Sequence, residues 1–165
     1  MSAIQIVEGN LLDSIAKYIV HQTNCVSHKS AGLAAEVFSR YPYADVYSER
    51  ADSPAKDLPG TIAVRGNGAE QRLIINMMGQ YFPGRSRYED SEMDGSKARK
   101  RYFFQCLTHI AEIPDLKSIA FPYGIGCGLA GGSWIEYLAL LEKFAVFIGD
   151  RASVSIVKLP TVVSK

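Results

Sequence analysis

This chain of 165 residues lacks the features that mark several large classes of protein. Its three cysteines, Cys25, Cys106 and Cys127, are widely spaced and form no Cys-x-x-Cys pair, which argues against a disulfide framework and a zinc site. No stretch approaches the roughly 18 apolar residues of a membrane helix, and the N-terminus has no signal-peptide pattern. We therefore expect a soluble protein of the cytosol or nucleus, without a metal or a cofactor.

The chain also has no marked excess of positive or negative charge. Lys and Arg number 18 and Asp and Glu 17, which gives a net charge of +1. Such a chain has no overall attraction to nucleic acid or to a membrane, so any binding of anions must be local. Hydrophobic residues make up 47% of the chain, enough for an ordinary core. The length predicts a single domain over residues 1–165, and we expect a monomer.

Short apolar runs alternate with stretches of helical periodicity. The runs predict strands at 3–7, 18–22, 61–65, 72–78, 117–121 and 153–159, and the periodic stretches predict helices at 31–40, 43–51, 97–112 and 134–148. The strands at 61–65 and 72–78 are expected to form a hairpin. In the helix at 97–112, the predicted outward-facing residues are Lys97, Arg99, Lys100 and Arg101. This order is typical of an α/β or α+β layered domain with a mixed sheet, whose site lies beyond the carboxyl ends of strands.

The stretch from Ser118 to Trp134 carries the strongest chemical pattern. A predicted buried strand leads into a loop with five glycines in nine residues, 124–132, and then into a helix. Glycine lets backbone N–H groups approach a ligand closely, and a strand-to-helix turn aims such groups at an anion. The loop therefore predicts a phosphate- or diphosphate-binding site, or else a tight turn kept for packing. A second loop of this kind, 23–32, also leads from a strand into a helix.

Three segments carry a resemblance to a known family. They are Val7-Glu8-Gly9-Asn10-Leu11-Leu12, Val20-His21-Gln22-Thr23-Asn24-Cys25 with Ser30-Ala31-Gly32-Leu33-Ala34, and Pro122-Tyr123-Gly124-Ile125-Gly126-Cys127-Gly128-Leu129 with Trp134. From about residue 3 to residue 159 the chain resembles a macrodomain, the module that binds ADP-ribose. The nearest branch holds the terminal ADP-ribose protein glycohydrolases and the ADP-ribose-1''-phosphate phosphatases. The resemblance implies a three-layer α/β/α sandwich around a six-stranded mixed sheet, with ADP-ribose in a cleft across its loop end.

The resemblance also implies which residues bind the ligand. Asn10, which follows Gly9, would meet the adenine amino group, and the backbone N–H of Leu11 would contact the base. The family usually has Asp at this position, and Asn offers an uncharged, weaker acceptor, unless it only caps a turn. The two loops would hold the diphosphate and the distal ribose through Asn24, Ser30, Ala31, Gly32 and Leu33, and through Tyr123, Gly124, Ile125, Gly126, Cys127, Gly128 and Leu129.

The candidate catalytic residues are Asn24, His28 and Lys29, beside the expected distal ribose. Asn24 would hold a ribose hydroxyl or orient a water, or it would form an Asx turn at the end of the strand. His28 and Lys29 would serve as general base or nucleophile, or place a phosphate, unless they are solvated bystanders. The glycohydrolases of this branch use a lysine, which we align with His28 and Lys29, and an aspartate, where this chain has Ala130. The missing carboxylate argues against that mechanism.

Two further features leave alternatives open. Cys127 in the glycine loop suggests a thiol nucleophile, but no base is placed for it and packing is the favoured reading. The stretch 79–95 is long for a connection and is a candidate lid. Its candidate residues are Gln80, Tyr81, Phe82, Arg85, Arg87 and Tyr88, of which the aromatic and arginine side chains would stack a base and hold a phosphate, or only anchor an exposed loop.

Three functions are compatible with these observations. The first is a hydrolase that binds ADP-ribose and removes a phosphate, an acyl group or a protein linkage from its distal ribose. The second is a non-catalytic reader of ADP-ribose or of ADP-ribosylated proteins, and the third is an interaction domain with a degenerate pocket. We expect Gly126→Glu to abolish ligand binding by filling the glycine loop while the fold persists.

Overall fold

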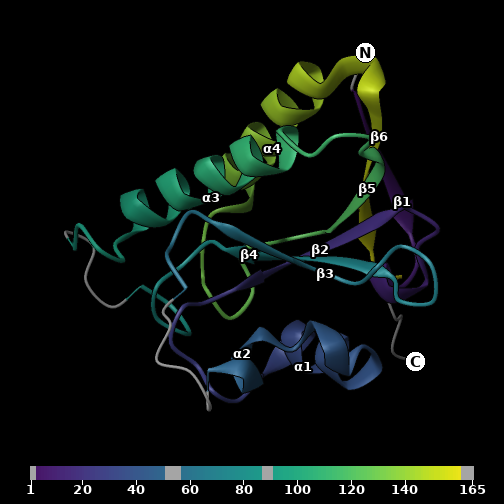
Figure 1. The fold of residues 1–165 in the computed structure, drawn as a ribbon. Coiled ribbons are helices and arrows are strands. Elements are labelled where there is room, and N and C mark those ends of the chain that lie inside the picture. Colours follow the sequence, from purple (N-terminus) through teal and green to yellow (C-terminus); the bar gives the residue numbers. More distant parts are fainter. Residues whose placement is uncertain (1–2, 51–56, 87–90, 161–165) are drawn as a thin grey trace, which may run out of the picture.

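The computed structural model describes residues 3–50, 57–86 and 91–160, which form three layers (Figure 1). The middle layer is a six-stranded mixed sheet in the order β1-β6-β5-β2-β4-β3. Its strands are β1 (Ile4–Glu8), β2 (Tyr18–Thr23), β3 (Ile62–Arg65), β4 (Leu73–Met78), β5 (Lys117–Pro122) and β6 (Ala152–Lys158). Neighbouring strands are parallel except β3, which pairs antiparallel with β4 and so forms the predicted hairpin.

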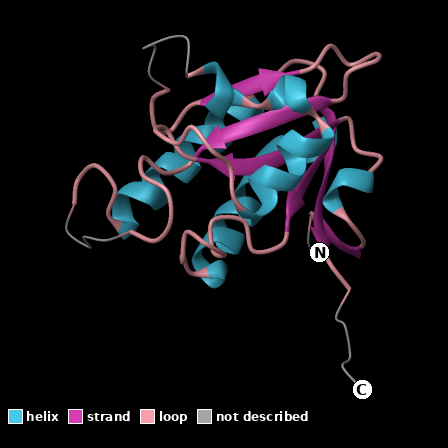
Figure 2. Cartoon of the chain, turned by 90° about the horizontal axis from the view of Figure 1, so that it is seen from below, coloured by secondary structure: helices cyan, strands magenta, loops and turns pink. Residues whose placement is uncertain are grey.

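Helices cover both faces of the sheet. The helices α1 (Gly32–Arg40) and α2 (Val46–Glu49) lie on one face, and α3 (Ser96–Ala111) and α4 (Trp134–Ile148) lie on the other. Figure 2 shows the same layers from below, with the helices on either side of the strands. Short 3₁₀ turns at Leu11–Asp13, Pro42–Ala44 and Gly149–Arg151 complete the chain. The predicted α/β/α sandwich with a six-stranded mixed sheet is confirmed.

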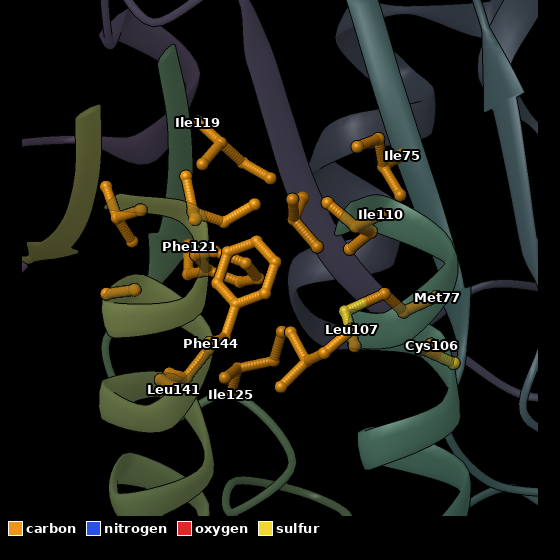
Figure 3. Packing of buried hydrophobic residues seen from close by; sticks show 14 of the residues in the cluster. Ile75, Met77, Cys106, Leu107, Ile110, Ile119, Phe121, Ile125, Leu141 and Phe144 are labelled. Carbon is orange, nitrogen blue, oxygen red and sulfur yellow. The ribbon is translucent and has the colours of Figure 1, made fainter. Parts of the chain in front are cut away.

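Two apolar cores hold the layers together because the central strands are buried on both faces. Under α3 and α4, Phe121 of the sheet packs edge-to-face on Phe144, with ring centroids 5.8 Å apart. Figure 3 shows this core, in which side chains of the sheet interdigitate with Ile110 and Leu141. Under α1 and α2 the second core includes Val37 and residues of β2 and β4. The edge strand β1 is mostly exposed, so burial is concentrated in the middle of the sheet.

The predicted helix over 43–51 is wrong in length. A 3₁₀ turn, Pro42–Ala44, comes first, and α2 covers only Val46–Glu49. Asp45 separates the two because its carboxylate accepts hydrogen bonds from the N–H groups of Tyr47 (3.0 Å) and Ser48 (3.1 Å). This side chain caps a new helix instead of continuing the old one. Ala51 lies outside the described residues.

The prediction that Arg99 faces outward is also wrong. Its side chain is 3% exposed and forms an ion pair with Asp94, whose Oδ2 lies 2.6 Å from Nη2. The same guanidinium donates to the carbonyls of Phe82, Gly84 and Ala130. Helical periodicity assigned Arg99 to a basic face, but partners from two distant loops satisfy its charge in the interior. The neighbouring predictions hold for Lys97 and Arg101, which are exposed, while Lys100 is half-buried.

The described residues contain no group of three or more His, Cys, Asp or Glu side chains that could hold a metal ion. Within the same ranges, no helix is long and apolar enough to cross a membrane. Cys25 and Cys106 are buried, Cys127 is half-buried, and all three are free thiols.

Candidate functional site

The ends of the parallel strands meet at one edge of the sheet, and a cavity of about 380 Å³ opens there. Segments that follow three strands form its walls: 23–34 after β2, 80–84 after β4 and 122–130 after β5. The sequence placed the site beyond the carboxyl ends of strands, and the cavity lies at that position.

Eleven of the predicted site residues line this cavity. They come from both predicted loops and are Asn24, Lys29, Ala31, Gly32, Leu33, Tyr123, Gly124, Ile125, Gly126, Gly128 and Leu129. The two loops touch each other, since a Cβ atom built on Gly32 would lie 3.0 Å from Cδ1 of Leu129. Loops separated by almost a hundred residues in sequence therefore form one site.

Six other predicted residues do not line the cavity: Gly9, Asn10, Leu11, His28, Ser30 and Cys127. His28 is exposed on the loop before α1. Gly9 follows β1, and its N–H donates to the carbonyl of Lys158 at the end of β6 (2.9 Å). Asn10 caps the following 3₁₀ turn, because its Oδ1 accepts from the N–H of Leu12 at 3.0 Å. The cap that we weighed as an alternative for Asn10 is thus formed, at a strand end outside the cavity.

Cys127 does not have the environment of a nucleophile. Burial raises the pKa of its thiol to about 11, so the thiol is protonated at neutral pH. Its Sγ lies 3.5 Å from the carbonyl oxygen of Ile125, two residues earlier. These observations fit the packing role.

The N-terminus of α1 faces the cavity without a cap. Ala31 holds the N-cap position, and no side chain in the described residues makes a capping hydrogen bond there. The next three residues, Gly32, Leu33 and Ala34, all line the cavity. The N–H groups of a first helical turn have no partner within the helix, and the helix dipole adds partial positive charge. This end of α1 is therefore suited to an anion.

The glycine loop 124–132 faces the N-terminus of α1 across the cavity. The turn is closed by hydrogen bonds from the N–H of Cys127 to the carbonyl of Gly124 (2.8 Å) and from that of Gly132 to Gly126 (3.0 Å). At Gly126 the backbone has φ +81°, and a Cβ atom there would lie 3.1 Å from the ring of Tyr137. Only glycine fits this position without strain. Gly128, in contrast, has open space around it and no positive φ.

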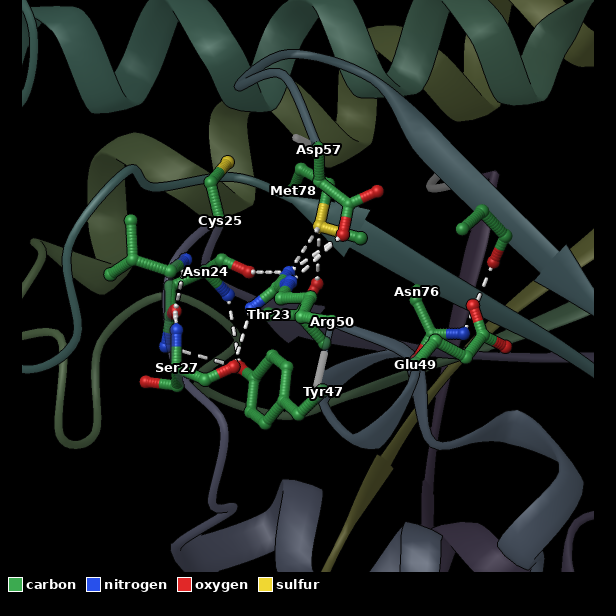
Figure 4. Close-up of polar contacts among 12 residues, drawn as sticks. Thr23, Asn24, Cys25, Ser27, Tyr47, Glu49, Arg50, Asp57, Asn76 and Met78 are labelled. Atoms are coloured by element: carbon green, nitrogen blue, oxygen red, sulfur yellow. Dashed lines mark hydrogen bonds and ion pairs between the residues drawn. The ribbon is translucent and has the colours of Figure 1, made fainter. Parts of the chain in front are cut away.

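Asn24 is buried at the cavity wall and makes the Asx-type contacts that were one of its two alternatives. Its Oδ1 accepts from the N–H groups of Val26 (3.0 Å) and Ser27 (2.8 Å). The hydroxyl of Tyr47 in α2 accepts from the backbone N–H of Asn24 (3.0 Å) and from its Nδ2 (3.2 Å). Figure 4 shows these contacts converging on Asn24. Asn24 therefore shapes the first loop, and its amide carries only one further N–H for a ligand.

Arg50 fixes the same loop from the other side. Its guanidinium donates to the carbonyls of Asn24 (2.6 Å) and Ser27 (2.8 Å) and lies 4.7 Å from the ring centre of Tyr47. Asp57 neutralises it, with 2.8 Å between Nη2 and Oδ2, and the Arg50 side chain is 8% exposed (Figure 4). Arg50 was not among the residues predicted from the sequence, because an arginine at a helix end has no local pattern that indicates a buried partner.

Two glutamines form part of the cavity wall, Gln80, which was predicted as part of the candidate lid, and Gln22, to which the sequence assigned no role. Nε2 of Gln22 donates to Oε1 of Gln80 at 2.6 Å, and Nε2 of Gln80 donates to the carbonyls of Phe82 and Gly84. Oε1 of Gln22 is buried and has no hydrogen-bond partner among the described residues, and it lies 3.2 Å from where a Cβ atom of Gly126 would be. The pair therefore lies between Gly126 of the glycine loop and the wall segment 80–84.

The charged side chains at the cavity are of one sign. Among the described residues that line it there is no aspartate or glutamate, and Lys29 is the one charged side chain. Ala130, at the position where a catalytic aspartate was considered, also lines it. The site offers backbone N–H groups, amides and one ammonium group, which suits an anionic ligand.

Comparison with known proteins identifies the fold. No protein-family model matches this chain, and no curated protein sequence is significantly similar to it. Among solved structures, the macrodomain of Mycobacterium tuberculosis DarG is 22% identical, with a TM-score of 0.71 over 96% of this chain and 98% of that one. The Thermus aquaticus DarG macrodomain is 21% identical, with a TM-score of 0.67 and the same coverage of both chains. A Trypanosoma brucei macrodomain in complex with ADP-ribose is 16% identical, with a TM-score of 0.65 over 95% of this chain and 63% of that one.

Proposed function

Because this chain has the macrodomain fold, we propose that it binds ADP-ribose in the cavity at the carboxyl edge of its sheet. The observation that carries the proposal is the N-terminus of α1, which faces a glycine loop across the cavity and which, in the described part of the chain, has no side-chain cap and no carboxylate beside it in the cavity lining. A diphosphate needs several N–H donors at once, and two such loops supply them without a cluster of basic residues. The structural neighbour from Trypanosoma brucei with bound ADP-ribose supports this ligand.

The contacts of the base are a further part of the proposal. Gly9, Asn10 and Leu11 stand at the end of β1, next to the end of β6, at the same edge of the sheet as the cavity. We propose that the adenine extends from the cavity to this corner. Oδ1 of Asn10 already accepts one hydrogen bond, from Leu12, and its second lone pair is available to the adenine amino group.

Calorimetric titration with ADP-ribose tests the function, and Gly128→Glu tests the site. A Cβ atom at this position would have nothing within 4 Å and requires no positive φ, and Gly128 lines the cavity, so we expect a glutamate here to bring its carboxylate to the place proposed for the diphosphate. We expect the affinity to fall by about a hundredfold or more, because like charges repel in a partly buried site. Gly128→Ala is the matched control and should bind almost as tightly as the unchanged protein. Full affinity in Gly128→Glu would contradict the site.

Gly126→Glu, the substitution expected from the sequence, is a poorer test. Its side chain would have to adopt a positive φ and would press on Tyr137 and Gln22. A loss of binding in that variant would then report local misfolding as well as a filled site. In contrast to the expectation from the sequence, we therefore expect Gly126→Glu to distort the glycine loop.

Hydrolysis at the distal ribose is the second candidate function. Lys29 favours it, because an ammonium group that lines the cavity is close enough to act as a nucleophile or to place a phosphate. His28, outside the lining, would have to move inward to take part. The test is release of phosphate from ADP-ribose-1''-phosphate and of ADP-ribose from modified proteins. Turnover that falls more than binding in Lys29→Ala supports the hydrolase, whereas binding without any turnover supports the reader.

A further inference from the structure

The wall segment 80–86 is held rigidly by side chains from outside the site. Asp94 accepts a hydrogen bond from the N–H of Tyr81 (2.8 Å) and pairs with Arg99 of α3. Arg99 donates to the carbonyls of Gly84 (2.7 Å) and Ala130 (3.3 Å). One buried guanidinium thus ties this wall to the end of the glycine loop. Of the candidate lid, 79–95, residues 87–90 lie outside the described residues, and the part that borders the cavity is anchored.

Arg85 projects from this anchored segment across the end of the glycine loop. A Cβ atom on Gly131 would lie 2.7 Å from Cγ and 2.9 Å from Nε of Arg85. The aliphatic stem and the start of the guanidinium therefore lie directly on the bare backbone of Gly131. On either side of this contact, Gly84 and Ala130 line the cavity. Arg85 itself is not a lining residue, but its neighbour Gly84 and Ala130, the neighbour of Gly131, are, so the arginine stem lies next to the cavity.

The charge of Arg85 is not neutralised within the described part of the chain. Arg85 is exposed and takes part in no ion pair or hydrogen bond there, while Arg50 and Arg99 each have a carboxylate partner. The adjoining cavity has no acidic lining residue among those described. Within the described residues, this guanidinium has no partner and the cavity beside it has no carboxylate, an arrangement suited to an anion.

We propose that Arg85 is a specificity-determining residue that pairs with a phosphate group carried by the ligand in addition to its diphosphate. This rests on the proposed function: ADP-ribose occupies the cavity, and the ribose beyond the diphosphate reaches Gly84 and Ala130. A phosphate on that ribose then meets the guanidinium of Arg85, which forms paired hydrogen bonds with phosphate oxygens. The end of the site at Ala130 thus favours a negative substituent, which a carboxylate at this position would repel.

The experiment compares the dissociation constants of two probes, ADP-ribose and ADP-ribose-1''-phosphate, by calorimetry. The unchanged protein should bind the phosphorylated probe about tenfold more tightly, the size of one charge-assisted contact. In Arg85→Ala this ratio should fall to about one. Arg85→Lys keeps the charge without the paired donors and should retain part of the preference.

Gly131→Ala provides a second, independent variant. It keeps Arg85 but places a methyl group where the arginine stem lies, so the ratio should fall as it does in Arg85→Ala. Gly149→Ala is its control: it has a similar positive φ (+56°), nothing within 4 Å and no part in the cavity, and the ratio should stay unchanged. Lys143→Ala, an exposed charge on α4, is the control for Arg85→Ala.

The possible results separate this inference from the proposed function. Loss of the preference in Arg85→Ala and Gly131→Ala, with both controls unchanged, supports the role of Arg85. Equal affinities of the unchanged protein for the two probes, or a preference that persists in Arg85→Ala, would overturn it while ADP-ribose binding stands. No heat with either probe would overturn the proposed function itself.

Discussion

Two helices on the same face of the sheet begin in opposite ways. At α2 the carboxylate of Asp45 accepts hydrogen bonds from two N–H groups of the first turn. At α1 the cap position holds Ala31, and the first helical residue, Gly32, has φ +58°. Alanine and a left-handed glycine are both poor choices for starting a helix. The comparison shows that the start of α1 is not optimised for stability. The first-turn N–H groups, which no described side chain caps, lie at the cavity.

The capped helix supports the uncapped one. Tyr47 of α2 accepts two hydrogen bonds from Asn24, which shapes the loop leading into α1. The ring of Phe38 in α1 packs edge-to-face on Tyr47, with centroids 5.3 Å apart, and on His21 of β2 at 5.2 Å. The cavity therefore combines a helix end whose N–H groups have no cap among the described side chains with surrounding loops whose polar groups are hydrogen-bonded.

The largest expected effect comes from giving α1 the cap that α2 has. In Ala31→Asp the carboxylate would accept from the first-turn N–H groups and should raise the free energy of unfolding by about 1 kcal/mol. The same carboxylate would occupy the anion site, so the affinity for ADP-ribose should fall by about a hundredfold or more. Urea denaturation and calorimetry measure the two quantities. Ala31→Ser, an uncharged cap, should stabilise similarly and weaken binding less, and a destabilised Ala31→Asp would contradict the comparison.

The next effect in size concerns His21 of β2, which is buried against Phe38 of α1. Burial lowers the pKa of His21 to about 4, against the opposing effect of its hydrogen bond to Asn76. The imidazole stays neutral in the folded state and takes up a proton in the unfolded state as the pH falls below about 6.5. The free energy of unfolding should therefore drop by about 2 kcal/mol between pH 7 and pH 5 on account of this residue, and its contribution should level off below the folded-state pKa.

His21→Gln is the variant that isolates this effect. It can keep the hydrogen bond to Asn76 but cannot titrate, so it should lower stability at every pH and flatten the dependence between pH 7 and pH 5. Urea denaturation of both proteins at several pH values measures the slopes. Equal slopes would show that His21 is protonated equally in the folded and unfolded states.

The smallest effect comes from making α2 resemble α1. Asp45→Ala removes the hydrogen bonds to the N–H groups of Tyr47 and Ser48 and should cost about 1 kcal/mol of stability. Asp45→Asn, which can still cap, should recover most of the loss. Binding of ADP-ribose should change much less than in Ala31→Asp, because the proposed ligand site is at the start of α1 and not at this helix end. A larger loss of affinity than of stability would contradict the division between scaffold and site.

Local sequence patterns predicted most of the elements and both of the loops that line the cavity. The bounds of α4 agree with the predicted helix at 134–148, and each of the six predicted strands is present within one residue at either end. The glycine loop and the loop before α1 were identified because glycines and strand-to-helix transitions are short-range features. The errors, the length of α2 and the outward direction of Arg99, both arose where a side chain has partners that periodicity cannot indicate.

The sequence by itself determined the layered fold, the edge of the sheet at which the cavity opens and the two loops that line it, since alternating apolar runs and glycine placement act locally. Only the tertiary structure decided that the start of α1 is uncapped toward the cavity, that Asn24 is held by Tyr47 and Arg50, and that Arg85 lies on Gly131. These contacts join residues far apart in the chain. Their energies depend on which loops meet in space, and no local pattern of residues encodes that.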